Sequence, residues 1–304
     1  MAIGPKSFVP ITRDERLAER VVRPKVTYWQ DAWRRFKLNR LAMVGLVVLA
    51  ILGLSAIFGP MLSPHTYDDQ SYDAMDLPPC REYWFGTDAL GRDLFVRVLH
   101  GARISLAIGV VSSLINLTIG VTYGAVAGFL GGRVDNVMMR IIDILYAVPI
   151  LLIVILLMVM LGAGLGNIFL ALGISYWLTM ARIVRGQILS IKEQDYILAA
   201  RVIGVQRWKM IVRHLIPNAI GPIVVYATLS IPTAIFLEAF LSFIGLGVSA
   251  PVASWGTLAS DGIQSMKSYP WQLFFPAAAI SLCLLSFNFV GDGLRDALDP
   301  RLRK

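Results

Sequence analysis

Long stretches without a charged residue constrain this chain more than any other feature of its sequence. They cover residues 41–67, 104–132, 144–181, 215–237 and 268–291. A helix needs about 20 apolar residues to cross about 30 Å of hydrocarbon. The third stretch is too long for one span, and the glycine-rich segment 162–167 divides it. The sequence therefore predicts an all-α integral membrane protein with six transmembrane helices, near residues 41–62, 103–130, 138–161, 166–187, 217–247 and 272–292.

Positive charge predicts the orientation of these helices. With the N-terminus in the cytoplasm, 23 of the 28 Lys and Arg residues fall on cytoplasmic segments and five on outside segments. Because cytoplasmic loops carry an excess of Lys and Arg, we expect both termini inside the cell (N-in/C-in). The net charge of +8 follows from this topology and does not indicate a nucleic-acid partner.

The residues before the first span predict an interfacial helix on the inner surface of the membrane. Residues 1–26 are polar and basic, and we expect them to form a flexible cytoplasmic tail. Trp29, Trp33 and Phe36 then fall on one helical face, beside basic residues that can reach lipid phosphates. The alternative is an ordinary continuation of the first span into water.

Polar side chains inside the predicted spans are candidates for lining a substrate path, because such residues are costly in lipid and often functional. Ser112, Ser113 and Asn116 form a polar patch on the second predicted helix, and Glu238 lies in the fifth. The second interpretation of these residues is hydrogen bonding between helices.

Glycines and prolines predict where the helices touch and bend. Gly120, Gly124 and Gly128 recur every four residues, which lets another helix approach closely in lipid. Pro149 falls inside the third predicted helix, where a proline frees carbonyl groups and bends the axis.

The sequence carries no signature of a catalytic, metal or nucleotide site. Cys80 and Cys283 are expected on an outside loop and in the last span, which argues against a disulfide, and no Cys/His cluster suggests a metal. No Gly-Lys dipeptide is present, so the chain has no P-loop of its own. A membrane-embedded enzyme is disfavoured because no His-Glu-x-x-His or Gly-x-Ser-x-Gly motif occurs. A stand-alone channel or secondary carrier is a further alternative.

The cytoplasmic loop 190–217 is the most informative part of the chain. Asp195 is a plausible N-cap, and Gly204 can end the following turn in a left-handed conformation. Pro217 begins the next span, where its missing N–H costs little. The apolar face between Asp195 and Gly204 consists of Tyr196, Ala199, Ala200 and Ile203.

A second amphipathic piece follows Gly204. Its apolar side holds Trp208, Ile211 and Val212, and its basic side holds Arg207, Lys209 and Arg213. Such a loop lies on the lipid surface or fits a groove in another protein.

The loop resembles the EAA loop of ABC importer permeases, which reads Glu-Ala-Ala, three residues, Gly, nine residues, Ile, one residue, Leu and Pro. Ala199, Ala200, Gly204 and Pro217 match in register, and Leu198 takes the place of the Glu. The resemblance implies that this loop docks a separate ATPase.

Other segments resemble the C-type permease of oligopeptide and dipeptide ABC importers. They are residues 85–93, 181–187, 241–247 and 291–300, and the resemblance covers about residues 29–304. It implies a type I ABC importer permease fold in the bacterial inner membrane. It also implies a path shared with a B-type permease, two cytoplasmic ATPase subunits, and an extracytoplasmic binding protein that delivers peptide. ATP and Mg would be bound by the ATPases and no cofactor by this chain; the alternative substrates are nickel and glutathione.

The expected organisation follows from the spans and the resemblance. Residues 27–100 hold the interfacial helix, the first span and an extracytoplasmic loop. Residues 101–294 form the type-1 permease domain with its coupling loop, and residues 295–304 form a cytoplasmic tail.

Overall fold

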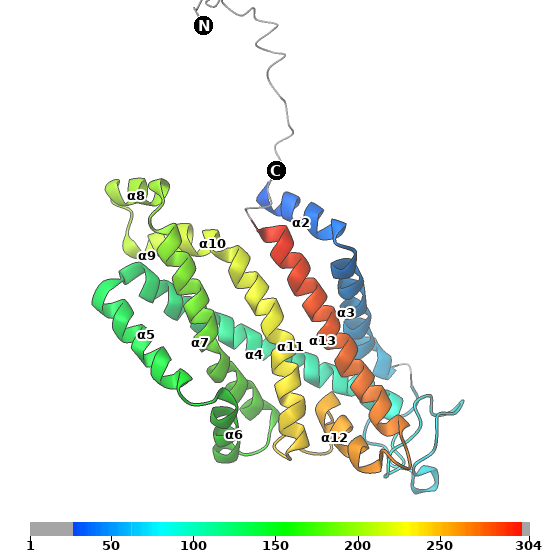
Figure 1. Cartoon of the computed structure of the whole chain (residues 1–304). Helices are drawn as coiled ribbons and strands as arrows, with labels where there is room; N and C mark the ends of the chain where they lie inside the picture. The colour runs from blue at the N-terminus through cyan, green and yellow to red at the C-terminus, as the bar shows by residue number, and fades with distance from the viewer. Residues whose placement is uncertain (1–26, 62, 300–304) are drawn as a thin grey trace, which may run out of the picture.

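The computed structural model describes residues 27–61 and 63–299, and this part of the chain is helical, with no strands (Figure 1). The predicted tail 1–26 and the last residues of the predicted tail 295–304 lie outside the described residues. The helices are α2 (Tyr28–Leu38), α3 (Arg40–Phe58), α4 (Leu94–Leu130), α5 (Gly132–Tyr146), α6 (Ile150–Leu161), α7 (Leu165–Ile191), α8 (Asp195–Val202), α9 (Arg207–Met210), α10 (Ile216–Asn218), α11 (Ile220–Phe243), α12 (Trp255–Ser265) and α13 (Trp271–Leu298).

The helices long and apolar enough to cross a membrane agree with the six predicted spans. Within the described residues, five qualify singly: α3 with its short 3₁₀ extension to Met61, α4, α7, α11 and α13. The sixth is the pair α5 and α6, which qualifies only when taken together.

The prediction of one continuous third helix over residues 138–161 is wrong. α5 and α6 meet at a bend of 78°, with Pro149 as the N-cap of α6. Proline has no N–H to donate and its ring displaces the preceding turn, so the helix breaks there instead of curving.

Several other helix boundaries differ from the prediction. α4 begins at Leu94 instead of near residue 103, because Asp93 caps it by accepting the Phe95 N–H at 2.9 Å. α11 ends at Phe243, before Gly245 turns the chain with a φ of +81°. α13 continues to Leu298, so the predicted start of the tail at residue 295 falls inside a helix. Helix α12 was not predicted from the sequence.

Helix α2, which the sequence predicts to be interfacial, has two different environments. Thr27 and Gln30 form a capping box at its start. Phe36 is buried in a cluster with Ala42 and residues of α13, whereas Trp29 and Trp33 remain more than half exposed. Only part of the predicted apolar face is therefore free to contact lipid, and its interfacial role stays a prediction.

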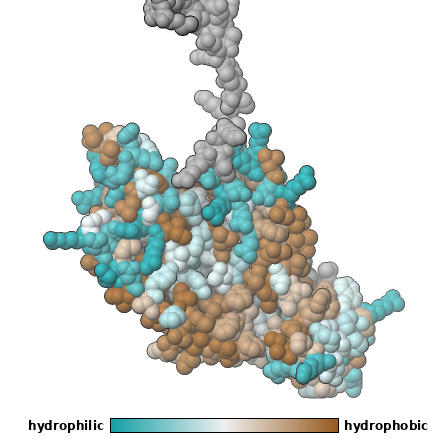
Figure 2. Space-filling view, viewed as in Figure 1, coloured by the Kyte–Doolittle hydropathy of each residue, from teal (hydrophilic) through white to brown (hydrophobic). Residues whose placement is uncertain are grey.

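The described ends of the chain lie on the same side of the helix assembly. In Figure 1, α2 and the end of α13 lie at the end that also carries α8, while α12 and the segment before α4 lie at the opposite end. Figure 2 shows hydrophobic residues over the flank between these ends and hydrophilic residues gathered toward the ends. This arrangement is the one that an N-in/C-in topology requires.

Helices α4 and α7 pack along the predicted glycine stripe. A Cβ added at Gly124 would lie 2.3 Å from the carbonyl oxygen of Ala181, and one at Gly120 would lie 2.5 Å from the Met180 side chain. Small residues at these positions allow the two backbones to touch, so the packing role predicted for the stripe is confirmed.

We expect Gly124→Ala to lower the free energy of unfolding by about 1–3 kcal/mol, the usual cost of overpacking. The matched control is Gly186→Ala on α7, where an added Cβ meets nothing within 4 Å. Unfolding of the detergent-solubilised protein measures both variants. Equal stability of the two would contradict the assigned helix contact.

Candidate functional site

The N-cap of helix α8 lies one residue before the predicted position. Gln194, with φ −79° and ψ 145°, is the N-cap, and no side-chain cap bond forms. Asp195 is the first residue of the helix, where a carboxylate interacts favourably with the helix dipole. The prediction of Asp195 as the cap is therefore wrong, although its place at this helix end is right.

The predicted left-handed end of α8 at Gly204 is confirmed. Gly204 has a φ of +80°, and its N–H donates to the Arg201 carbonyl at 3.1 Å. The Val205 N–H donates to the Ala200 carbonyl at 3.1 Å, which completes a Schellman motif. A Cβ at Gly204 would meet nothing within 4 Å, so glycine is required here by the backbone and not by space.

The two faces of α8 have different roles. Ile197 and Ala200 are buried in a cluster with the end of α7 and with Met210 and Leu215. The opposite side is exposed and apolar, with Val202 87% and Ile203 80% exposed. The predicted face thus mixed two surfaces, since Ala200 packs within the chain. The exposed surface, called the α8 face below, consists of Tyr196, Leu198, Ala199, Val202 and Ile203.

The second amphipathic piece is also divided differently from the prediction. Ile211 is buried, whereas Trp208 is 62% exposed and Val212 is exposed as well. Arg207 is exposed beside Trp208. The α8 face and Trp208 therefore form a projecting surface at one end of the molecule, with hydrophobic residues visible at its tip (Figure 2).

Pro217 lies at the first turn of α10, as predicted for the start of the next span. The turn before it, Ile211–Leu215, is a π-helix in which the Ile216 N–H donates to the Ile211 carbonyl five residues back. A wider turn accommodates a proline that cannot donate to the helix ladder.

Glu238 joins three helices inside the chain. It is completely buried, and its carboxylate accepts hydrogen bonds from Ser242 at 2.7 Å, Ser254 at 2.6 Å and Ser105 at 3.5 Å. The Trp255 N–H in turn donates to Ser105 at 3.1 Å. This network links α4, α11 and the start of α12. It agrees with the second interpretation of Glu238, hydrogen bonding between helices. A path-lining role for Glu238 stays a prediction.

The polar patch on α4 is also buried. Ser113 bonds to the Ser230 hydroxyl at 2.8 Å and to the Ala227 carbonyl at 2.9 Å. Ser112 and Asn116 are buried with side-chain atoms that have no hydrogen-bond partner among the described residues. Their role in lining a path likewise stays a prediction.

A groove that the sequence did not predict lies at the α5–α6 break. Its volume is about 540 Å³, and no charged side chain lines it. The Tyr146 and Thr179 hydroxyls bond to each other, and Ser230 connects the groove to Ser113. Only Pro149 signalled it in the sequence, because the hydroxyls come from three separate helices. This hydroxyl groove is lined by Tyr146, Val148, Pro149, Ile150, Tyr176, Thr179, Tyr226, Leu229, Ser230 and Thr233.

Comparison with known families accounts for this architecture. The family described as "Binding-protein-dependent transport system inner membrane component" matches residues 120–304, and "N-terminal TM domain of oligopeptide transport permease C" matches residues 27–79. The chain belongs to the binding-protein-dependent permease family. Members are inner-membrane components, so the chain is a multi-pass protein of the bacterial inner membrane.

Curated permeases resemble this chain over nearly their whole length. The dipeptide permease protein DppC of Bacillus subtilis is 54% identical over 98% of this chain and 93% of its own. The oligopeptide permease protein OppC of the same organism is 53% identical over 98% and 97%. OppC of Escherichia coli K12 is 48% identical over 95% and 96%.

The fold agrees with that of a solved transporter. A chain of the inward-facing methionine ABC transporter MetNI aligns with a TM-score of 0.54 and 19% identity, over 68% of this chain and 96% of that chain. The expected type I ABC importer permease fold is thus confirmed.

We expect Gly204→Val to leave this permease inserted in the membrane but to reduce its transport activity. A β-branched residue at a positive φ costs about 1–3 kcal/mol of backbone strain, which would displace the α8 face. The membrane-inserted amount and the rate of uptake by the complete transport system measure the effect.

The control is Gly162→Val, at the turn between α6 and α7. Gly162 has a φ of +82° and equally open surroundings. Valine there should cause the same backbone strain as at Gly204, but at the end of α7 that is distant from α8. Normal transport in Gly204→Val would contradict a role of the α8 face in transport.

Proposed function

We propose that this chain is the permease subunit of a bacterial ABC importer that takes up oligopeptides or dipeptides. The peptide arrives on an extracytoplasmic binding protein, and the path is shared with a second, B-type permease. Two cytoplasmic ATPases bind ATP and Mg, and this chain binds no cofactor. The high identity to peptide permeases supports this substrate class, and none of the relatives named above is a nickel or glutathione permease by name.

The exposed apolar α8 face is the observation that supports a contact with an ATPase. Val202 and Ile203 expose most of their surface to solvent, on a helix anchored underneath by Ile197 and Ala200. Apolar side chains on a short exposed helix fit a groove on a partner protein. In this proposal the α8 face is inserted into the ATPase, and Arg207 and Trp208 extend the contact.

The anchoring of α8 suggests how movement of the ATPases reaches the substrate. Its buried side packs against the end of α7 and against the segment that leads into α11. Both of these helices carry side chains of the hydroxyl groove, Thr179 on α7 and Tyr226 on α11. A displacement of α8 would therefore change the width of the groove.

The hydroxyl groove suits a peptide main chain. Tyrosine and threonine hydroxyls both donate and accept hydrogen bonds, so they can pair with peptide N–H and C=O groups whatever the side chains are. The absence of charge among the residues lining it avoids a preference between acidic and basic peptides. We therefore assign this groove to the wall of the translocation path.

The test of the ATPase contact is the double variant Val202→Asp, Ile203→Asp. Carboxylates in the interface should weaken ATPase binding by about 2 kcal/mol or more, roughly 30-fold, while the membrane-inserted amount stays normal. Co-purification from membranes measures binding. The control is Tyr72→Asp, which replaces a 70% exposed side chain on the opposite side of the membrane. Retained ATPase binding in the double variant would reject the proposed contact.

The test of the groove is removal of single hydroxyls without loss of ring volume. We expect Tyr226→Phe and Tyr176→Phe each to reduce peptide uptake about fivefold, since one hydrogen bond contributes about 1 kcal/mol. ATPase binding should not change. The control is Tyr123→Phe, whose hydroxyl donates to the Met138 carbonyl at 2.9 Å and lies outside the groove lining. Uptake that falls no further than in this control would exclude the groove from the path.

A further inference from the structure

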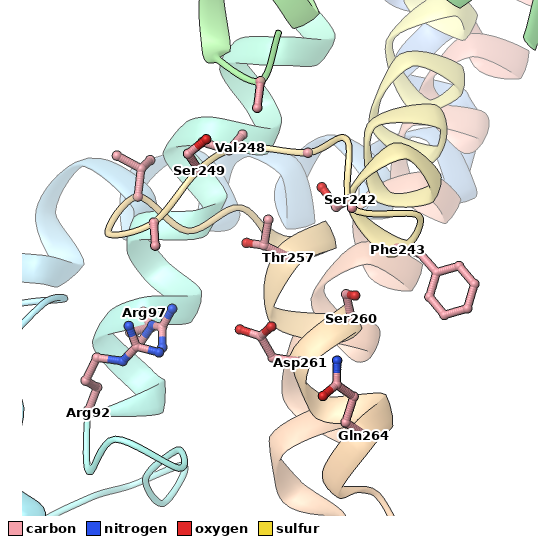
Figure 3. Close-up of a pocket in the computed structure, with 15 residues that line it drawn as sticks. Arg92, Arg97, Ser242, Phe243, Val248, Ser249, Thr257, Ser260, Asp261 and Gln264 are labelled. Atoms are coloured by element: carbon pink, nitrogen blue, oxygen red, sulfur yellow. The ribbon is translucent and has the colours of Figure 1, made fainter. Parts of the chain in front are cut away.

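A polar cavity of about 380 Å³ opens at the outer end of the molecule (Figure 3). Its walls come from the segment around the start of α4, the turn between α6 and α7, the end of α11, the loop into α12, and α12 itself. The polar residues that line this outer cavity are Arg92, Arg97, Ser242, Ser249, Thr257, Ser260, Asp261 and Gln264.

The outer cavity is built by two motifs that neither the α8 face nor the hydroxyl groove uses. The first is the segment 85–93, in which Gly91 turns the chain with a φ of +70° and Asp88 accepts the Leu90 and Arg92 N–H groups at 2.9 and 3.0 Å. The second is the segment 241–247, in which Gly245 turns the chain after α11. The fold brings these distant segments to one site.

One wall of the cavity carries a net positive charge. The Asp88 carboxylate accepts a hydrogen bond from Arg92 Nε at 2.7 Å and also pairs with Arg97. One carboxylate shared by two guanidinium groups leaves one positive charge uncompensated. The Arg97 side chain is only 5% exposed, and its Nε has no hydrogen-bond partner among the described residues. A buried donor of this kind favours an acceptor supplied by a ligand.

The opposite wall carries a free negative charge. Asp261 projects from α12 toward the two arginines across the cavity (Figure 3). It makes no ion pair within 4 Å in the described part of the chain. A simple anion would be repelled by Asp261 and a simple cation by the arginines. A ligand with separate positive and negative groups satisfies both walls.

We propose that the outer cavity binds the charged ends of a short peptide, the carboxylate at Arg92 and Arg97 and the ammonium group at Asp261. This inference rests on the proposed peptide substrate. Guanidinium groups bind carboxylates with strong, charge-assisted hydrogen bonds, and the cavity volume falls in the range of roughly 300–1,000 Å³ typical of small-molecule sites. Since Ser242 of the cavity and Thr233 of the hydroxyl groove both lie on α11, the outer cavity would be an entry site ahead of the groove.

The experiment compares uptake of trialanine, N-acetyl-trialanine and trialanine amide by the complete transporter in proteoliposomes. In Asp261→Asn we expect uptake of the two peptides with a free ammonium group to fall about tenfold relative to the acetylated peptide. In Arg92→Gln we expect the preference for a free carboxylate over the amide to fall by a similar factor. The binding protein is the same throughout, so its own selectivity cancels when each variant is compared with the wild type.

Two control variants separate charge recognition from structural damage. Asp261→Glu keeps the charge and should retain the preference for a free ammonium group. Asp73→Asn removes an exposed carboxylate elsewhere on the outside segment, away from the cavity lining, and should change no ratio.

Equal losses for all three peptides in Asp261→Asn would overturn the proposal and indicate another role, such as docking of the binding protein. Unchanged ratios would overturn it as well. Uptake of trialanine by the wild type tests the proposed function by itself. Wild-type uptake with unchanged variant ratios therefore rejects only the outer cavity, whereas no wild-type uptake rejects both.

Discussion

The absence of water in the hydrocarbon core is the constraint on which the rest of this structure depends. Every backbone N–H and C=O in the membrane must find a partner within the protein, and helices meet this demand locally. Departures from regular helix therefore need compensation. The break at Pro149 borders the hydroxyl groove, and the π-helix before Pro217 lies at the cytoplasmic loop. These two departures lie where we propose that substrate and ATPase act.

The mechanical connection between those two places is the packing around α8. Ile197 and Ala200 anchor this helix to α7 and to the approach to α11, while Val202 and Ile203 remain free on the other side. One face of α8 is packed in the core of its own chain and the other is available to a partner. A partner that displaces α8 would therefore also displace the helices packed against it. The groove residues on α7 and α11 lie further along the same two helices. The coupling that we propose therefore needs no flexible linker, only a rigid displacement of packed helices.

Polar residues in this chain serve two different purposes according to their partners. Glu238 is surrounded by the hydroxyls of Ser105, Ser242 and Ser254, so its carboxylate links α4, α11 and the start of α12. Asp261 has no ion-pair partner among the described residues and faces a cavity. What distinguishes their roles is whether nearby side chains already satisfy them.

The sequence by itself determined the features that depend on local pattern. The spans follow from uncharged length, the orientation from Lys and Arg, the left-handed turn at Gly204 from glycine after an apolar turn, and the α4–α7 contact from glycines four residues apart. Only the tertiary structure decided which side of α8 is free, what surrounds Glu238, how sharply α5 and α6 diverge, and that Arg97 faces Asp261. These features depend on residues brought together from distant segments, and the periodicity of one segment contains no information about the neighbours it will meet.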